Sequence, residues 1–408
     1  MARLIPKRVV AALAATAVAA GLLATGPAAT AGHAAITIQT GAPLGGENLP
    51  AESNRFFGPD TIAVHQGDRV TFDFRGFHTA TLLPKGTSPD DWVADNATTT
   101  GGFSFAVNDP DDGAGEYKDN FGVIVSPTDP TCGGAGQTPC SYTGDDVLNS
   151  GAPFEPGQTF TVAVNAEPGT SFWVICLIHQ HHMRKRIRVV ADPASATPQS
   201  VIDEVKRAQI AADMDWAEAT HKKYSDRRTS HEAAGGRRVW DAWAGVDNRH
   251  ASLYSFYPKR LKVDKGDVVR WHFDALVHED HTVSMPLPAA VTRMEFDQPA
   301  CDPDGDEGTQ PDTEPSFDQQ TGEPSCPEGT TLEFDLSDAF WGGTGNGVLS
   351  GRNDVEHSGI RGVQAEALTP PAAGSDSFDV RFGAKSGNRP FEYFCFIHSG
   401  MEATVAVD

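Results

Sequence analysis

The sequence "FEYFCFIHSGMEATVAV" (Phe391–Val407) places Cys395, His398 and Met401 within seven residues and then alternates apolar and polar residues. Alternation of this kind is typical of a half-buried β-strand, so the three side chains lie on a short loop between two predicted strands. A thiol, an imidazole and a thioether on one loop form a soft, mixed set of metal ligands. This stretch therefore predicts both a β-rich fold and a metal site at the end of a strand.

The same layout occurs earlier in the chain. In "FWVICLIHQHHMRKRIRVV" (Phe172–Val190), Cys176, His179 and Met183 precede a predicted strand, with one more residue between histidine and methionine. Two neighbouring histidines form either a second metal site or, as we favour, an exposed part of the loop. These are His181 and His182.

Two further stretches repeat upstream of these loops. "TIAVHQGDRVTFDF" (Thr61–Phe74) matches "RLKVDKGDVVRWHF" (Arg260–Phe273), and both indicate a strand, a Gly-Asp turn and a second strand. Each is followed by a His-Thr pair, at His78 and at His281. His278 is the alternative to His281 as a ligand, but His281 aligns better with His78 because a threonine follows both. Many short strands separated by glycine- and proline-rich turns predict two β-sandwiches.

The predicted architecture is all-β, with two sandwich domains joined by a helical linker. Residues Thr197–Tyr224 carry apolar side chains at helical spacing, and we expect this helix to pack on a domain. The basic, glycine-containing sequence that follows is predicted to be a linker. The predicted parts are a signal peptide (residues 1–31), a first domain (32–191), the helix and linker (192–238) and a second domain (239–408).

The ligand types favour copper over zinc. Two histidines, one cysteine and a weak, distant methionine are typical of a blue-copper electron-transfer site, whereas zinc favours a closed set of cysteines and histidines. A single cysteine or histidine is more often a buried or surface residue, and the two isolated cysteines are able to pair with each other. The repetition of the whole set favours a metal. The predicted ligands are His78, Cys176, His179 and Met183 in the first copy, and His281, Cys395, His398 and Met401 in the second.

With these motifs the chain resembles a tandem of cupredoxin domains, the plastocyanin, azurin and amicyanin group of type 1 copper proteins. "CFIHSGM" (Cys395–Met401) is similar to the short amicyanin-type loop, and "CLIHQHHM" (Cys176–Met183) is one residue longer. The resemblance implies Greek-key sandwiches with one type 1 copper in each. It also implies that the second histidine of each set, His179 or His398, has an edge near the surface and passes electrons to redox protein partners.

We expect a secreted blue copper protein that carries single electrons, and not an enzyme. Multicopper oxidases need additional histidines beside the type 1 cysteine, but Ile175 and Leu177 flank one cysteine here, and Phe394 and Phe396 flank the other. Copper nitrite reductases need one second-copper histidine next to the cysteine and another shortly after the first ligand. Both are absent, and the latter positions hold Leu83 and Pro286. The alternatives are a copper-dependent oxidoreductase related to those enzymes, a copper storage or delivery protein, and a metal-free first domain. Because the two loops differ, a relay of electrons between the sites is a further hypothesis.

The N-terminus is typical of a secretory signal. Arg3, Lys7 and Arg8 precede an alanine-rich apolar run and the small-residue sequence "ATA". A membrane anchor is the alternative, but the run is short for a bilayer span. Removal of residues 1–31 takes away three basic residues and changes the formal net charge from −23 to −26. We expect so acidic a protein to repel nucleic acids and anionic membranes.

Secretion permits disulfides, and four of the six cysteines form two local pairs in loops. We predict the disulfides Cys132–Cys140 and Cys301–Cys326, although six cysteines allow fifteen pairings. The second loop is acidic, and its D-x-D-x-D sequence from Asp302 resembles part of a calcium-binding loop. The glycine and bidentate glutamate of such a loop are missing, so an exposed acidic loop is favoured over calcium.

Overall fold

The computed structural model describes most residues from His33 to Asp408, which form one compact unit. The described ranges are 33–46, 49–97, 106–108, 117–119, 125–153, 156–233, 235–273, 280–287, 289–290, 300–302, 316–317, 324–327, 331–333, 345–361, 377–398 and 400–408. The predicted signal peptide lies outside these residues. None of the described helices has the length and apolar character needed to span a membrane.

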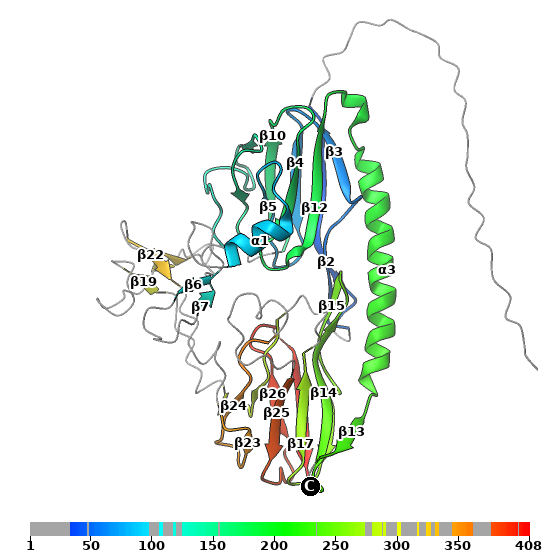
Figure 1. Cartoon of the computed structure of the whole chain (residues 1–408), viewed down its shortest axis with the longest axis vertical. Coiled ribbons are helices and arrows are strands. Elements are labelled where there is room, and N and C mark those ends of the chain that lie inside the picture. Colours follow the sequence, from blue (N-terminus) through cyan, green and yellow to red (C-terminus); the bar gives the residue numbers. More distant parts are fainter. Residues whose placement is uncertain are drawn as a thin grey trace, which may run out of the picture. The chain divides into compact units, whose positions relative to one another are not determined.

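The strands of the first copy form two facing sheets. One is ordered β1 (Ala35–Leu44), β4 (Arg69–Phe74), β10 (Thr159–Val164) and β8 (Cys140–Tyr142). The other is ordered β3 (Thr61–His65), β12 (Gln180–Val190), β11 (Ser171–Cys176), β5 (Thr81–Leu82) and β9 (Leu148–Asn149). In β4 the predicted alternation places Val70, Phe72 and Phe74 in the core between these sheets. We call β1 to β12 the first half (Figure 1).

The second copy repeats this strand order. One sheet is ordered β14 (Arg238–Asp247), β17 (Val268–His272), β25 (Ser377–Phe382) and β23 (Val348–Leu349). The other is ordered β16 (Arg260–Val263), β27 (Glu402–Val407), β26 (Phe391–Phe394), β18 (Ser284–Met285) and β24 (Glu356–His357). Val269 and Trp271 alternate into the core between them. We call β13 to β27 the second half. The predicted all-β sandwich class is confirmed in both halves.

One strand from each half joins the two larger sheets. β2 (Ala51–Phe56) pairs with β1, β15 (Ala251–Tyr257) pairs with β14, and the two pair antiparallel with each other. Glu52 lies opposite Ser252 in this register. Together with β13 (Thr229–Glu232), the strands form a single 11-stranded sheet. The halves therefore share backbone hydrogen bonds, and the exact domain boundaries given above stay a prediction.

A long helix, α3 (Gln199–Ser225), covers this junction. It extends over the segment predicted to be helical, and its side chains Ile210, Met214 and Ala217 pack in one cluster with Trp243 and Leu253. The helix therefore docks within the chain, as expected from its apolar stripe. The segment after it is not merely a linker, because β13 pairs with β14. The other helical elements are α1 (Pro89–Ala97) and the short 3₁₀ helix η1 (Pro193–Ser195).

Short strand pairs lie between the first histidine and the cysteine of each copy. These are β6 (Ala106–Asn108) with β7 (Tyr117–Asp119), β19 (Ala300–Asp302) with β22 (Thr331–Glu333), and β20 (Ser316–Phe317) with β21 (Pro324–Ser325). Most of the acidic segment considered for calcium, from residue 303 to 315, lies outside the described residues. Cys326 is disulfide-bonded, while the side chain of Cys301, its predicted partner, also lies outside what the structure describes.

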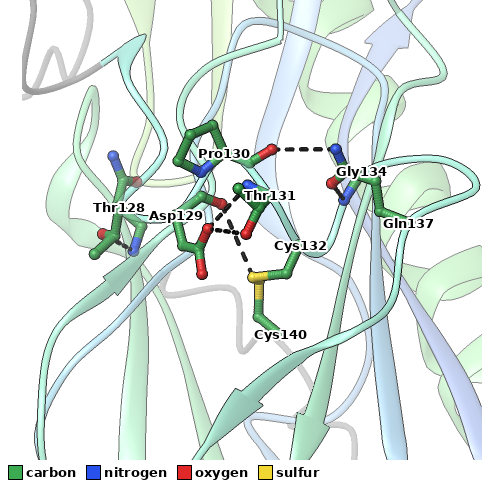
Figure 2. The surroundings of a disulfide bond; sticks show 9 residues. Thr128, Asp129, Pro130, Thr131, Cys132, Gly134, Gln137 and Cys140 are labelled. Carbon is green, nitrogen blue, oxygen red and sulfur yellow. Dashed lines mark hydrogen bonds between the residues drawn. A yellow bond between two sulfur atoms is a disulfide. The ribbon is translucent and has the colours of Figure 1, made fainter.

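Cys132 and Cys140 are eight residues apart in sequence and form a disulfide that closes a short loop (Figure 2). Cys140 is buried in the core of the first half. Just before the disulfide, the carboxylate of Asp129 accepts hydrogen bonds from the backbone N–H and the hydroxyl of Thr131. The disulfide thus fastens an ordered turn to the edge strand β8.

We expect the double variant Cys132→Ala/Cys140→Ala to lower the free energy of unfolding by roughly 2–3 kcal/mol, the value that loop-closure entropy predicts for a loop of this length. Urea unfolding of the two proteins would measure it. The variant is preferable to chemical reduction because Cys326 is also disulfide-bonded. An unchanged urea midpoint would contradict the prediction.

Candidate metal centres

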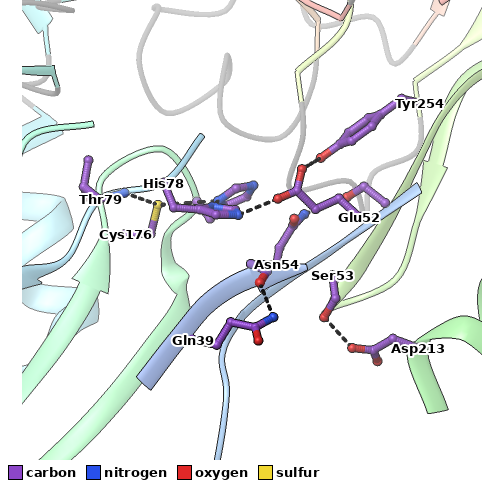
Figure 3. Close-up of polar contacts among 12 residues, drawn as sticks. Gln39, Glu52, Ser53, Asn54, His78, Thr79, Cys176, Asp213 and Tyr254 are labelled. Atoms are coloured by element: carbon purple, nitrogen blue, oxygen red, sulfur yellow. Dashed lines mark hydrogen bonds and ion pairs between the residues drawn. The ribbon is translucent and has the colours of Figure 1, made fainter. Parts of the chain in front are cut away.

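The first candidate site lies where the loop after β4 meets the loop between β11 and β12. Nδ1 of His78 is 3.3 Å from Nδ1 of His179. Sγ of Cys176 is 3.9 Å from the first nitrogen and 3.5 Å from the second. All three side chains are buried, with exposed fractions of 2% or less. The fold thus brings His78 against Cys176 and His179, which lie 98 and 101 residues further along the chain. Figure 3 shows His78 beside Cys176.

The second candidate site has the same construction. Nδ1 of His281 is 3.1 Å from Nδ1 of His398, and Sγ of Cys395 is 3.9 Å and 3.7 Å from these two nitrogens. His281 and Cys395 are buried, and His398 is half-buried. Neither cysteine is in a disulfide, so the alternative in which Cys176 and Cys395 pair with each other is wrong.

The separations of the ligand atoms fit one metal ion at each site. Two donor atoms that each lie about 2.0–2.3 Å from a metal, at angles of about 100–120°, are about 3–4 Å apart. The measured N–N and S–N distances lie in this range. One thiolate with two imidazoles is a donor set that suits copper.

The structure places both predicted methionines in the hydrophobic cores. Met183 and Cys176 belong to one core cluster, and Met401 and Cys395 belong to the other. The longer first loop is accommodated by a register shift between Ile175 and Cys176 in the β11–β12 pair. Each thioether is therefore buried in the same core cluster as its cysteine, and its role as a weak axial ligand stays a prediction.

Matching threonines hold the two cysteines. The backbone N–H of Thr79 donates to Sγ of Cys176 at 3.4 Å, and that of Thr282 donates to Sγ of Cys395 at 3.3 Å. Each threonine hydroxyl also accepts a hydrogen bond from the backbone N–H of the residue after the cysteine, at 2.7 and 2.8 Å. The repeated His-Thr pair therefore supplies both a candidate ligand and an N–H donor that stabilises sulfur as a thiolate.

The surrounding charges favour the thiolate form. Burial raises the pKa of Cys176, but hydrogen bonds and charge from His179 and His78 outweigh it and lower the pKa to about 5. Burial also raises the pKa of Cys395, and its two histidines hold that pKa well below the ordinary value. Burial lowers the pKa of His78, whereas the carboxylate of Glu52 and the thiol of Cys176 raise it to about 9. The thiolate is the form of cysteine that binds a metal.

A matching glycine makes room for the first histidine of each site. Gly41 lies at a register shift of β1 and Gly245 at the equivalent shift of β14, with φ angles of 73° and 72°. A Cβ atom on Gly41 would collide with Nε2 of His78, and one on Gly245 with Nε2 of His281. These β-bulges therefore bring the backbone directly against the imidazole edge.

We expect Gly245→Ala to displace His281 and to weaken copper binding at the second site by about an order of magnitude or more, as loss of a ligand's support does. Copper titration followed by its visible absorption would measure this. Gly266→Ala is the matched control, because Gly266 also has a positive φ of 103° but nothing lies within 4 Å of its added Cβ. Equal copper affinity in the two variants would contradict the prediction.

Two serines near the sites were missed by sequence reasoning although a repeat marks them. Ser150 and Ser358 each lie in a Ser-Gly pair and accept a hydrogen bond at 2.8 Å from the backbone of the residue two positions after the first histidine. Their hydroxyls donate to the next glycine carbonyl. A comparison of the two copies at these positions would have found them.

Two other residues were missed for which no pattern existed. Oε1 of Glu52 lies 2.8 Å from Nε2 of His78. The ring of Tyr254 stacks on the ring of His398. Neither residue belongs to a repeated motif, and both come from the strands that join the two halves.

The first site departs from the surface exposure that the family resemblance implied. His179 is only 2% exposed, so its ring has no open edge at the surface, whereas His398 is half-buried. His182, expected on an exposed part of the loop, instead lies at the start of β12 and is half-buried, and its backbone N–H donates to the carbonyl of His179. The side chain of His181 and the whole of His278 lie outside the described residues. The expected surface edge of the second histidine is therefore absent at the first site.

A third group of potential ligands, His33, His65 and Asp68, lies at the first Gly-Asp turn. Asp68 accepts hydrogen bonds from the backbone N–H groups of Ala34 and His65, both at 2.7 Å. In the second half, Asp267 accepts the corresponding backbone bonds at the other Gly-Asp turn. The repetition of these bonds assigns Asp68 to the structure of the turn.

No family model matches the chain, and no curated protein matches it in sequence. Among solved structures, it is similar to a blue copper oxidase from Nitrosomonas europaea, at 12% identity over 92% of this chain and 86% of that chain, with a TM-score of 0.17. A copper nitrite reductase from Nitrosomonas europaea is similar at 11% identity over 92% and 94%, with a TM-score of 0.18. The multicopper oxidase mgLAC is similar at 13% identity over 62% and 66%, with a TM-score of 0.18.

These comparisons contradict the expectation that the chain is not an enzyme, because the similar solved structures are copper oxidases and a copper nitrite reductase. At TM-scores this low, the likeness assigns neither a substrate nor a residue role to this chain. The two sheets of each half enclose one core, and the loops at one end bring His, Cys and His together. Each half of the protein thus has a cupredoxin-like fold.

Proposed function

We propose that the protein is an extracytoplasmic copper-dependent oxidoreductase in which each half holds one type 1 copper ion. The observation that carries the proposal is the doubled ligand set. In each half, one buried thiol lies within 4 Å of two imidazole Nδ1 atoms. Copper bound there would supply a one-electron redox couple in a rigid ligand set.

The chain's own residues support this chemistry in three ways. Thr79 and Thr282 stabilise the thiolates through backbone N–H donors. Oε1 of Glu52 accepts a hydrogen bond from the Nε2–H group of His78, so that Nδ1 is the nitrogen that would bind a metal in place of its proton. The cores around Cys176 and Cys395 exclude water from the sulfur atoms. The ligands are therefore held in place before a metal binds.

Two further parts of the proposal concern location and partners. The Cys132–Cys140 disulfide supports an oxidising compartment outside the cytoplasm, which fits the predicted signal peptide. We expect redox proteins as electron donors or acceptors. The basic segment Arg184–Arg188 lies beside the first site. The loop of the second site, Cys395–Met401, has no lysine or arginine, so the two sites would select different redox partners.

Reconstitution with copper tests the proposal. The protein without its signal segment is expected to bind two copper ions and to show the intense visible absorption of a copper–thiolate bond. With a small one-electron donor, it is expected to consume an acceptor such as dioxygen or nitrite. A colourless protein with both thiols titratable would overturn the copper assignment. A coloured protein that turns over neither acceptor would overturn the enzymatic part.

A further inference from the structure

The two candidate copper sites are linked by side chains from both halves. Oε1 of Glu52 lies 2.8 Å from Nε2 of His78, and the Tyr254 hydroxyl donates to Oε2 of Glu52 at 3.4 Å. The ring of Tyr254 then stacks on the ring of His398, with centroids 4.4 Å apart and an interplanar angle of 13°. A continuous series of contacts therefore runs from a candidate ligand of the first site to a candidate ligand of the second, and Figure 3 shows its part from His78 through Glu52 to Tyr254.

This series of contacts, which we call the Glu52–Tyr254 bridge, depends on how the halves are joined. Glu52 lies on β2 and Tyr254 on β15, the two strands that pair across the junction. The backbone N–H of Tyr254 donates to the carbonyl of Pro50 at 2.9 Å, which fixes the phenol beside the carboxylate. Room for that carboxylate comes from Gly76, where an added Cβ would collide with Oε1 of Glu52.

The bridge is mostly shielded from water. The side chain of Glu52 is 17% exposed and that of His78 is 1% exposed. A carboxylate taken out of water is costly unless charged or hydrogen-bonding groups compensate it. Here one oxygen of the Glu52 carboxylate contacts His78 of the first half, and the other contacts Tyr254 of the second half. The carboxylate thus connects the halves at the point where the two ligand sets approach each other.

We propose that the Glu52–Tyr254 bridge couples the two copper sites and is the route by which an electron moves between them within one chain. This inference rests on the proposed function. The step is a one-electron exchange, in which reduced copper at one site is oxidised and oxidised copper at the other is reduced. No covalent bond forms or breaks, and the protons on Nε2 of His78 and on the Tyr254 hydroxyl stay in place. A small one-electron reductant supplies the electron.

The burial of His179 strengthens this assignment. In the first site the second histidine has no surface edge, so electrons need another way in or out. His78 offers one through its hydrogen bond to Glu52. Direct hydrogen bonds and ring stacking transmit electronic coupling better than a gap between side chains. The coupling of the sites is therefore expected to depend on two residues that are not metal ligands.

Substoichiometric pulse reduction of the copper-loaded protein tests the bridge. Cys176→Ser and Cys395→Ser proteins supply the spectra of the separate sites. In the wild-type protein, we expect the electron to redistribute between the sites in a first-order phase that is independent of protein concentration. Tyr254→Leu removes the stacking and the hydroxyl, and is expected to slow that phase by about an order of magnitude or more. Tyr254→Phe keeps the ring and is expected to have a smaller effect.

Two further variants separate coupling from general damage to the junction. Ser252→Ala removes the hydrogen bond from Asn54 across the same strand pair but keeps the backbone register in which residue 252 lies opposite Glu52, so the redistribution rate should stay unchanged. Glu52→Gln removes a negative charge beside His78. It is expected to raise the reduction potential of the first site alone, because a nearby negative charge favours oxidised copper.

The outcomes distinguish the bridge from the proposed function. If Tyr254→Leu and Glu52→Gln retain both copper bands and the wild-type redistribution rate, the bridge is wrong and the copper assignment stands. A redistribution rate in the wild-type protein that increases with protein concentration would also overturn the bridge, since exchange would then occur between molecules. If the wild-type protein binds no copper, the proposed function itself is wrong.

Discussion

Replacement of Cys395 by serine is expected to remove all of the visible copper–thiolate absorption of the second site and to leave that of the first site intact. Sγ of Cys395 is the sulfur donor within 3.9 Å of both histidine Nδ1 atoms there. A serine hydroxyl is a hard donor that keeps its proton at neutral pH, so neither the soft ligand nor its charge-transfer band survives. Cys176→Ser is expected to show the reverse pattern.

Metal counting and optical spectra of the three proteins measure the effect. Wild-type protein should hold two copper ions, and each serine variant should hold one tightly. The double variant Cys132→Ala/Cys140→Ala is the control, because it also removes sulfur from the chain but touches neither candidate site. It should keep both bands. Loss of both bands in either single serine variant would show that the sites are not independent in metal binding, contrary to the separate ligand sets.

Replacement of Asp213 by alanine is expected to destabilise the protein by about 3 kcal/mol, the lower end of the range for breaking a buried ion pair. Asp213 lies on α3 and is 3% exposed. Its carboxylate accepts two hydrogen bonds from Arg55, at 2.7 and 2.9 Å, and one from Ser53 at 2.6 Å. The alanine variant would leave a partly buried guanidinium without its partner. The Arg55 side chain is 18% exposed, which places the expected loss at the low end of the range.

Urea unfolding of the variant and of a control on the same helix measures this loss. Asp215→Ala also removes a carboxylate from α3, but Asp215 is exposed, so we expect a change within about 0.5 kcal/mol. Asp213→Asn keeps an oxygen acceptor and should lose less than the alanine variant. Similar losses in Asp213→Ala and Asp215→Ala would contradict the prediction.

Most of the ligand set could be predicted because its members are close in sequence or repeat in register. Cys395, His398 and Met401 share one loop, and His281 was identified through the repeated His-Thr pair. The structure brings the histidines and the cysteine together. Glu52 and Tyr254 could not be found in this way, because 202 residues separate them and neither repeats.

Two functional expectations were corrected for different reasons. The expectation that the protein is not an enzyme was based on the absence of histidines beside Cys176 and Cys395. The comparisons with copper oxidases and a nitrite reductase contradict it. The surface edge of His179 was carried over from a family resemblance. A histidine's exposure depends on what packs over it, which a ligand motif does not specify.

The sequence by itself determined the strand-rich halves, the Gly-Asp turns, the long helix and which histidines and cysteines are candidate ligands. Alternation, turn chemistry and ligand spacing act between near neighbours in the chain, so they can be read without the fold. Only the tertiary structure decided that β2 pairs with β15, that Asp213 fastens α3 to that junction, and that Glu52 and Tyr254 link the two sites. Two edge strands pair where their unpaired backbone N–H and C=O groups meet in space. Whether they meet depends on contacts between residues that are far apart in the sequence.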